Sequence, residues 1–170
     1  KRIYNGKAWR YRNLNALPQQ NYGDTLYPQQ KGLVNRMNTE QLCSLAESLD
    51  CKILKNRQLR DFTTFKVGGE CPVIIEINSE NSLAKLIKFS NEHHLRTMVI
   101  GKGSNMLCDD KGFDGAVFLM GNDFAKIRLI GEETIEAEAG CPLIRLCRFA
   151  LDNSLSGLEF AYGIPGTVGG

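Results

Sequence analysis

The chain has 170 residues, 42% of them hydrophobic and 24% charged, with a formal net charge of +2 at pH 7. These values are ordinary for a globular domain and exclude a chain too polar to build a core. No apolar run approaches the roughly 18 residues of a membrane span, and no apolar leader precedes the domain, so we expect a cytoplasmic protein without membrane attachment.

The charge is distributed unevenly. Residues 1–36 hold seven Lys or Arg and one acidic residue, whereas the remainder holds fourteen basic and eighteen acidic residues. Aromatic residues are scattered through the basic segment without helical or strand periodicity, so we expect a disordered basic extension. Two other interpretations stay open: an arm that binds nucleic acid, and translated sequence upstream of a start at Met37.

Six cysteines are present, and no two of them have the CxxC spacing of a zinc or redox site. We therefore predict reduced thiols that pack as small hydrophobic side chains, and no metal site. Cys108 and Cys141 follow glycine-containing turns, where a thiol could line a pocket.

A globular pattern begins after residue 36, and we predict one domain over residues 37–170. Apolar residues at helical spacing predict a helix from Asn38 or Thr39 to about Leu49, and residues 53–54 predict a short strand. A polar and aromatic extended segment, 56–69, leads to a strand at 73–77, a helix from Ser79 to about His94 and a strand at 97–100. This strand–helix–strand unit has the length of a right-handed parallel crossover.

Three more strands are predicted next. We expect one at 116–120 after the turn at 112–115, and two further strands, 125–130 and 134–139, joined by a Gly-Glu-Glu turn. Apolar residues alternate with glutamates in the second of these, as in a strand with one buried face. Pro142 fits the first turn of a helix that ends near Asp152 or Asn153.

Residues 101–105, Gly-Lys-Gly-Ser-Asn, are the first informative segment. Glycines directly after a buried strand allow successive N–H groups to point into one concavity, and Ser and Asn add side-chain donors. Such a turn suits a phosphate or pyrophosphate. It is neither a P-loop nor a dinucleotide-binding fingerprint of the GxGxxG type, because the required Gly-Lys-Ser/Thr or third glycine is missing.

Residues 163–170, Gly-Ile-Pro-Gly-Thr-Val-Gly-Gly, are the second informative segment. So many glycines with a proline exclude a helix or a central strand. Ile164 and Val168 are unusual in a solvated tail, so we predict an ordered loop against which a flat ligand can lie.

These motifs carry a resemblance to a known family. Residues 63–69, 101–105, 139–140, 157–159 and 163–170 occur in the order and spacing of the UDP-N-acetylenolpyruvoylglucosamine reductases, FAD enzymes of peptidoglycan precursor synthesis. The resemblance covers residues 38–170, and the string at 163–170 is its most specific part. It implies an α+β fold with two lobes, one containing a small parallel βαβ unit and the other an antiparallel sheet with helices.

The resemblance also implies a cofactor site between the lobes. FAD is the implied cofactor, NADPH the co-substrate and UDP-N-acetylglucosamine enolpyruvate the substrate, in a monomer that binds neither nucleic acid nor membrane. The pyrophosphate would be held by Gly101, Lys102, Gly103, Ser104 and Asn105. The flavin and its diphosphate arm would be approached by Gly140, Ile164, Pro165, Gly166, Thr167, Val168 and Gly169.

The sequence departs from the family by stopping at residue 170. The catalytic arginine, the proton-donating serine and the late glutamate of the family have no counterpart here, so we predict a cofactor-binding portion without catalytic residues, inactive alone. Two alternatives remain: another FAD-dependent oxidase of the same fold class, and a small non-enzymatic binding protein with a basic arm.

Overall fold

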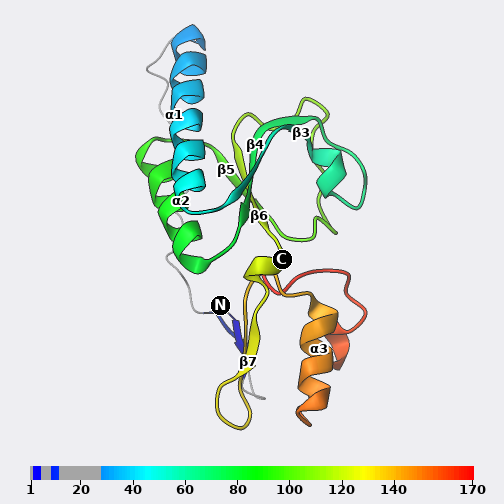
Figure 1. Cartoon of the computed structure of the whole chain (residues 1–170). Coiled ribbons are helices and arrows are strands. Elements are labelled where there is room, and N and C mark those ends of the chain that lie inside the picture. The colour runs from blue at the N-terminus through cyan, green and yellow to red at the C-terminus, as the bar shows by residue number, and fades with distance from the viewer. Residues whose placement is uncertain (1, 5–8, 12–27) are drawn as a thin grey trace.

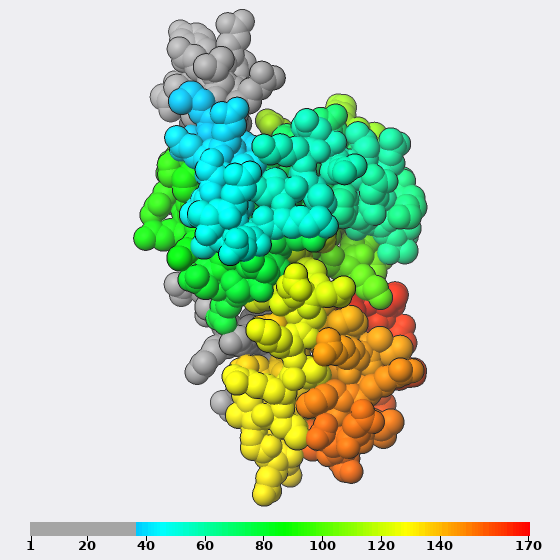
Figure 2. Space-filling view, viewed as in Figure 1, coloured from blue at the N-terminus to red at the C-terminus, as the bar shows by residue number. Residues whose placement is uncertain are grey.

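The computed structural model describes the backbone of residues 2–4, 9–11 and 28–170 and the side chains from Met37 onward. The described elements form two lobes, one above the other in Figure 1. The space-filling view shows a waist between the cyan and green lobe and the yellow, orange and red one (Figure 2). The two-lobed α+β fold predicted from the sequence is therefore confirmed.

The first lobe is a mixed sheet with helices on one face. Its strand order is β3-β4-β6-β5, in which β3 (Lys52–Gln58) is antiparallel to β4 (Glu70–Ile77), and both β4 and β5 (Thr97–Ile100) are parallel to β6 (Ala116–Met120). The predicted parallel unit is present, but β6 lies between its two strands. The spacing of residues along the chain predicts the length of the crossover connection, but it does not predict which strand pairs between β4 and β5.

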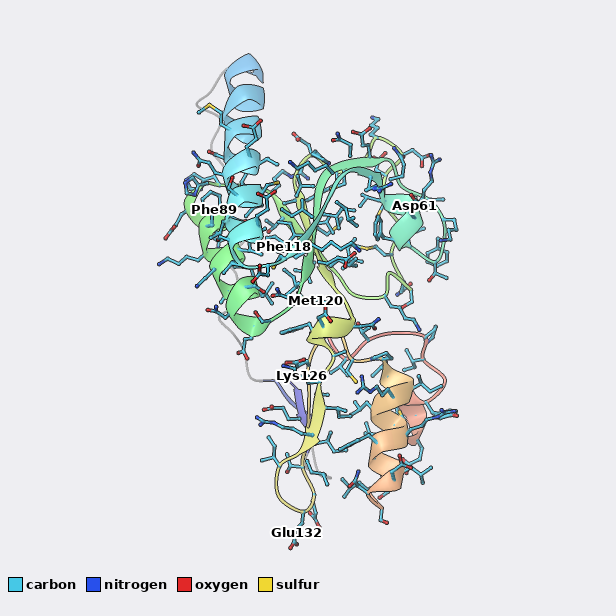
Figure 3. All side chains as sticks on the ribbon, viewed as in Figure 1. Asp61, Phe89, Phe118, Met120, Lys126 and Glu132 are labelled. Carbon is cyan, nitrogen blue, oxygen red and sulfur yellow. The ribbon has the colours of Figure 1, made fainter. Side chains whose placement is uncertain are left out.

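Side chains of the central strands point alternately to the two faces of the sheet, so the lobe has a hydrophobic core on each face. Ile75 and Phe118 face α1 (Pro28–Ser48) and α2 (Glu80–Glu92), and both side chains are fully buried. Ile74 and Val117 face the opposite side, where they pack with Leu59 of the 3-10 helix η1 (Leu59–Phe62). Figure 3 shows Phe118 inside this lobe and Met120 at its lower end, close to the second lobe.

The second lobe is an antiparallel sheet covered by one helix. Its order is β2-β1-β8-β7, formed by β1 (Arg2–Tyr4), β2 (Trp9–Tyr11), β7 (Ile127–Leu129) and β8 (Ile135–Ala137). The helix α3 (Leu143–Asp152) packs Leu146 and Ala150 against Ile135 and Ala137. The 3-10 helix η3 (Glu159–Ala161) follows α3 in this lobe, whereas η2 (Asn122–Phe124), after β6, packs Phe124 in the core of the first lobe.

The N-terminal part of the chain differs from the prediction. The sequence predicts a disordered extension over residues 1–36, yet residues 2–4 and 9–11 pair as strands, with Arg2 opposite Ala137 on β8. Helix α1 begins at Pro28, ten residues before the predicted start at Asn38, and runs through Met37 without a break. The strands form because the edge of β8 supplies backbone partners, which no local pattern reveals. The rest of the predicted extension lies outside the described residues.

The other predicted helices and strands are confirmed, with shifts at their ends, but the segment 56–69, predicted as extended, contains the 3-10 helix η1 after the end of β3. Ser79 caps α2 in a reciprocal arrangement with Ser82, in which each side chain bonds the backbone N–H of the other. Helix α3 follows Pro142 as predicted. Among the described helices, none has the length and apolar character needed to cross a membrane.

Candidate functional site

The predicted anion turn lies where the two lobes meet. Strand β5 ends at the buried Ile100, and residues 101–105 continue from its carboxyl end beside Leu119 near the end of β6. Open α/β sheets bind their ligands at this edge, beyond the carboxyl ends of the parallel strands. In Figure 2, this edge of the sheet lies at the level of the waist between the two lobes.

The turn has a set of free donors. Within the described part of the chain, none of the N–H groups of residues 101–105 donates to a protein acceptor, and the side chains of Lys102, Ser104 and Asn105 form no hydrogen bond. Gly103 is buried and Gly101 and Ser104 are half-buried. N–H groups at such positions normally have partners, so their lack of one marks a place where a ligand or water completes the set. An anion is the best partner for several convergent N–H groups.

Glycine is required in this turn for two different reasons. Gly103 has φ +61°, and a Cβ there would overlap the carbonyl oxygen of Phe62. Gly101 has no such backbone constraint, but a Cβ at this position would overlap Oγ1 of Thr167 from the second lobe. The missing side chain at Gly101 therefore lets the two lobes come into contact.

The segment 163–170 is ordered, as predicted. Leu143 N–H donates to Gly166 O at 3.0 Å, and Val168 N–H donates to Cys141 O at 2.9 Å, which fixes the loop against the start of α3. Thr167 is 6% exposed and Val168 1% exposed. The loop is thus part of the second lobe, held at the turn of the first.

The structure separates the predicted contact residues into two groups. Thr167 lies against Gly101, and a Cβ built on Gly166 would stand 3.7 Å from Oγ of Ser104, so these positions are brought together. Ile164 and Pro165 are exposed beside them. Val168 instead packs in the core of the second lobe, which leaves only its backbone for a ligand.

Gly140 and Gly169, like Val168, belong to the group of predicted residues that the structure does not place against the turn. A Cβ on Gly140 would stand 2.5 Å from the carbonyl oxygen of Phe124, and one on Gly169 would stand 2.7 Å from Cβ of Ala139. Gly140 N–H also donates to Phe124 O at 2.8 Å. Both glycines therefore allow close packing against Phe124 and Ala139, which themselves contact the core of the first lobe.

A hollow of about 440 Å³ opens beside the turn. It is lined by Gly101 and Lys102, by Leu119, and by the segment after η1, namely Asp61, Phe62, Thr63, Thr64 and Lys66. Figure 3 places Asp61 at η1. Two lysines against one carboxylate make the rim favourable for an anion.

The segment after η1 is tied to the turn by backbone hydrogen bonds. Thr64 N–H donates to Gly103 O at 2.9 Å, and Gly69 N–H donates to Asp109 O at 2.9 Å. The buried Thr63 hydroxyl donates to Val67 O at 3.2 Å and holds the intervening residues in a tight loop. Thr63, Thr64 and Lys66 were not predicted as site residues, although residues 63–69 carried part of the family resemblance and were the signal that could have found them.

Burial disfavours the reactive thiolate form of Cys71, Cys108 and Cys141. Cys71 and Cys141 are fully buried, and burial raises the pKa of both thiols. Cys108 is half-buried, and desolvation raises the pKa of its thiol as well. Protonated thiols are poor nucleophiles and ligands, so the prediction of small packed side chains is confirmed for the buried members.

Comparison with known families identifies the group that the geometry suits. A family model described as FAD binding domain matches residues 71–170. The chain belongs to the FAD binding domain family. The matched residues include β4, the glycine turn and the loop at 163–170, so the elements that form the junction lie within the family's own fold.

Two curated relatives carry the same name. The chain is 45% identical over 125 residues to the UDP-N-acetylenolpyruvoylglucosamine reductase of Caldicellulosiruptor saccharolyticus, covering 73% of this chain and 39% of the relative. It is 39% identical over 131 residues to the reductase of the same name from Streptococcus pneumoniae strain JJA, covering 77% of this chain and 42% of the relative. The chain therefore spans about two fifths of the length of these relatives.

The residues at the junction fit the diphosphate of FAD. The N–H groups of residues 101–105 have no protein acceptor among the described residues, and Lys66 and Lys102 supply positive charge. The exposed Ile164 offers an apolar surface on the second lobe. The hollow also lies within the range of about 300–1,000 Å³ that is usual for small-molecule sites.

Proposed function

We propose that this chain is the FAD-binding portion of a UDP-N-acetylenolpyruvoylglucosamine reductase that uses NADPH and UDP-N-acetylglucosamine enolpyruvate. The family membership and the relatives' shared name support this proposal. The observation that carries it is the run of N–H groups at 101–105 without protein acceptors, placed against Thr167 of the opposite lobe. We also propose that the portion acts in the cytoplasm as a monomer.

The residues of this chain bind and orient the cofactor. We propose that the N–H groups of residues 101–105 and the hydroxyl of Ser104 donate to the diphosphate oxygens, while Lys66 and Lys102 neutralise their charge. Gly166 and Thr167, with the backbone of Val168, approach the arm that joins the diphosphate to the flavin, and Ile164 offers an apolar surface to the ring. Gly140 and Gly169 hold this loop by close backbone packing.

When bound, FAD supplies the hydride chemistry, and the protein supplies position and electrostatics. Reduction of the enol ether also needs a group that delivers a proton to carbon. We propose that this group belongs to the part of the reductase that the chain does not match. On this proposal the chain alone holds oxidised FAD and does not turn over the UDP-sugar.

The first experiment is flavin retention. The full 170-residue chain is incubated with FAD and desalted, and the visible flavin absorption that elutes with the protein is measured. Retention at about one flavin per chain is expected. A folded protein that elutes without flavin at every FAD concentration tested contradicts the proposal.

Paired lysine variants test the site itself. Lys66→Ala and Lys102→Ala each remove one exposed cation from the rim, and we expect about tenfold weaker FAD binding for each, roughly 1.4 kcal/mol. Lys111→Ala is the matched control, because Lys111 is an exposed lysine on the loop that follows the turn and does not line the hollow. Equal loss in all three variants indicates general electrostatic attraction and contradicts the assigned site.

A further inference from the structure

The basic N-terminal segment has no part in the proposed FAD site, yet the structure gives it a definite place. Strand β1 pairs antiparallel with β8, with residues 2–4 opposite residues 135–137, and β2 pairs with the other side of β1. Figure 1 shows the blue strand against the yellow hairpin of the second lobe. The N-terminal segment therefore extends the sheet of this lobe from the edge of β8.

The sheet depends on this extension. Without it, only β7 and β8 would remain, each three residues long, and an isolated two-stranded hairpin is marginally stable in water. Strand β8 also carries Ile135 and Ala137, two core residues that are 1% and 2% exposed. The strand that gains a partner from β1 is thus one on which the core of the lobe depends.

The charges of the two paired segments are complementary. Residues 1–12 contain five Lys or Arg and no Asp or Glu, whereas residues 127–138, which form the β7–β8 hairpin, contain four Glu and one Arg. Segments of opposite net charge attract one another at short range. The charge asymmetry of the sequence therefore favours the N-terminal segment as the occupant of the β8 edge.

Strand β8 leads directly into the backbone that holds the loop at 163–170. The carbonyl oxygen of Ala139, two residues after β8, accepts a hydrogen bond from Gly169 N–H at 2.9 Å. Val168 packs in the same core cluster as Ile135. A partner that orders β8 therefore also orders the loop that meets the glycine turn.

We infer that residues 1–12 are a strand ligand built into the chain, which docks on the edge of β8 by backbone pairing and charge and thereby tightens FAD binding at the junction. Strands β7 and β8 lie within residues 71–170, which match the FAD binding domain family, whereas residues 1–12 lie outside that match. The pairing of β1 with β8 spans three residues, so it can open while the rest of the lobe stays folded. The FAD part of the inference rests on the proposed function, and the docking part does not.

Hydrogen exchange of the full chain without FAD tests the docking. Ile3→Pro removes an N–H and fixes φ in the middle of β1, a strand with neighbours on both sides, where proline is not accommodated. The amides of residues 135–137 should exchange about tenfold faster in this variant. Asn15→Pro is the matched control, a proline in the same N-terminal region but outside β1 and β2, and should leave this exchange unchanged.

A synthetic peptide of residues 1–13 tests whether the segment acts as a ligand. Added to the Ile3→Pro chain, it should restore slow exchange at residues 135–137, whereas a peptide that itself carries Ile3→Pro should not. Raising NaCl from about 0.05 M to about 0.5 M should weaken the restoration, because salt screens the attraction between the charged segments. Failure of the wild-type peptide to slow the exchange at low salt contradicts the inference.

A charge-reversal variant covers the case in which Ile3→Pro does not fold. Arg10→Glu/Arg12→Glu leaves β1 unchanged in sequence and removes the charge complementarity, and exchange at residues 135–137 should again be faster. Unchanged exchange in this variant and in a folded Ile3→Pro would overturn the docking. A wild-type dimer that Ile3→Pro dissociates would place β1 on a second copy, and an oligonucleotide bound only by chains with the native charge, with equal exchange in all, would assign the segment to nucleic acid; both results overturn the inference.

FAD titration measures the coupling to the junction. The Ile3→Pro chain should bind FAD at least about fivefold more weakly than the wild type, and the wild-type peptide should recover the affinity. Equal FAD affinity in the two proteins overturns the coupling. The exchange measurements contain no FAD, so failure of the docking and failure of the proposed FAD site are distinguishable.

Discussion

Replacing Gly101 by alanine tests the contact between the lobes directly. The added methyl group would overlap Oγ1 of Thr167, while the next nearest atom of that residue, its Cβ, would be at an ordinary 3.6 Å. Gly101 does not have a positive φ, so the backbone itself tolerates alanine. The cost therefore comes from the steric overlap at the junction.

The magnitude follows from overpacking. Forcing one methyl group into a filled contact costs about 1–3 kcal/mol. If the loop at 163–170 moves away to relieve the overlap, that cost is expressed as weaker FAD binding, about 5- to 150-fold. The cost falls on binding more than on folding, because Thr167 contacts the turn while each lobe keeps its own core.

Fluorescence titration of FAD measures the effect. The double variant Gly101→Ala/Thr167→Ala removes the overlapping oxygen and should recover most of the lost affinity relative to Gly101→Ala. Gly121→Ala is the matched control, because a Cβ there meets nothing within 4 Å. Wild-type affinity in Gly101→Ala, or no recovery in the double variant, refutes the described contact.

Three further outcomes are expected. Gly103→Ala combines a positive φ with overlap of the Phe62 carbonyl; its thermal unfolding midpoint should fall and FAD retention should be lost, and an unchanged midpoint contradicts this. Phe118→Ala empties a fully buried position and should lower the free energy of unfolding by about 3–5 kcal/mol in urea titrations. Glu159→Gln removes a carboxylate whose pKa is lowered by hydrogen bonds from Gly157 and from its own backbone. Because a lowered pKa stabilises the fold above the unfolded pKa, the variant should be less stable at neutral pH, and the difference should vanish as acid protonates the native carboxylate; a difference that persists in acid contradicts the assignment.

Local patterns predict the elements of this fold well. The apolar run at 73–77 and the capping serine at 79 predict β4 and α2, and both are present. The alternating glutamates of 134–139 predict β8. Each of these signals depends on neighbouring residues alone, so the sequence is sufficient to identify them.

Long-range pairing is what the sequence does not reveal. The insertion of β6 between β4 and β5 depends on residues far apart in the chain, as does the pairing of residues 2–4 with β8. The site shows the same limit: the glycine turn is evident from residues 101–105, but the participation of Thr63, Thr64 and Lys66 follows from a backbone bond between Thr64 and Gly103. No periodicity encodes that bond.

The contact between Gly101 and Thr167 joins residues that are far apart in sequence and belong to different lobes. Closing a long loop has an entropic cost, and contacts across the junction offset it, among them Phe124 and Ala139, which pack against the core of the first lobe. A cofactor bound across the junction would add to these contacts by mass action, at about 2.7 kcal/mol when its concentration is a hundred times the Kd. FAD would then be a folding partner of this chain as well as its redox group, and the yield of assembled protein in a cell would follow the supply of flavin.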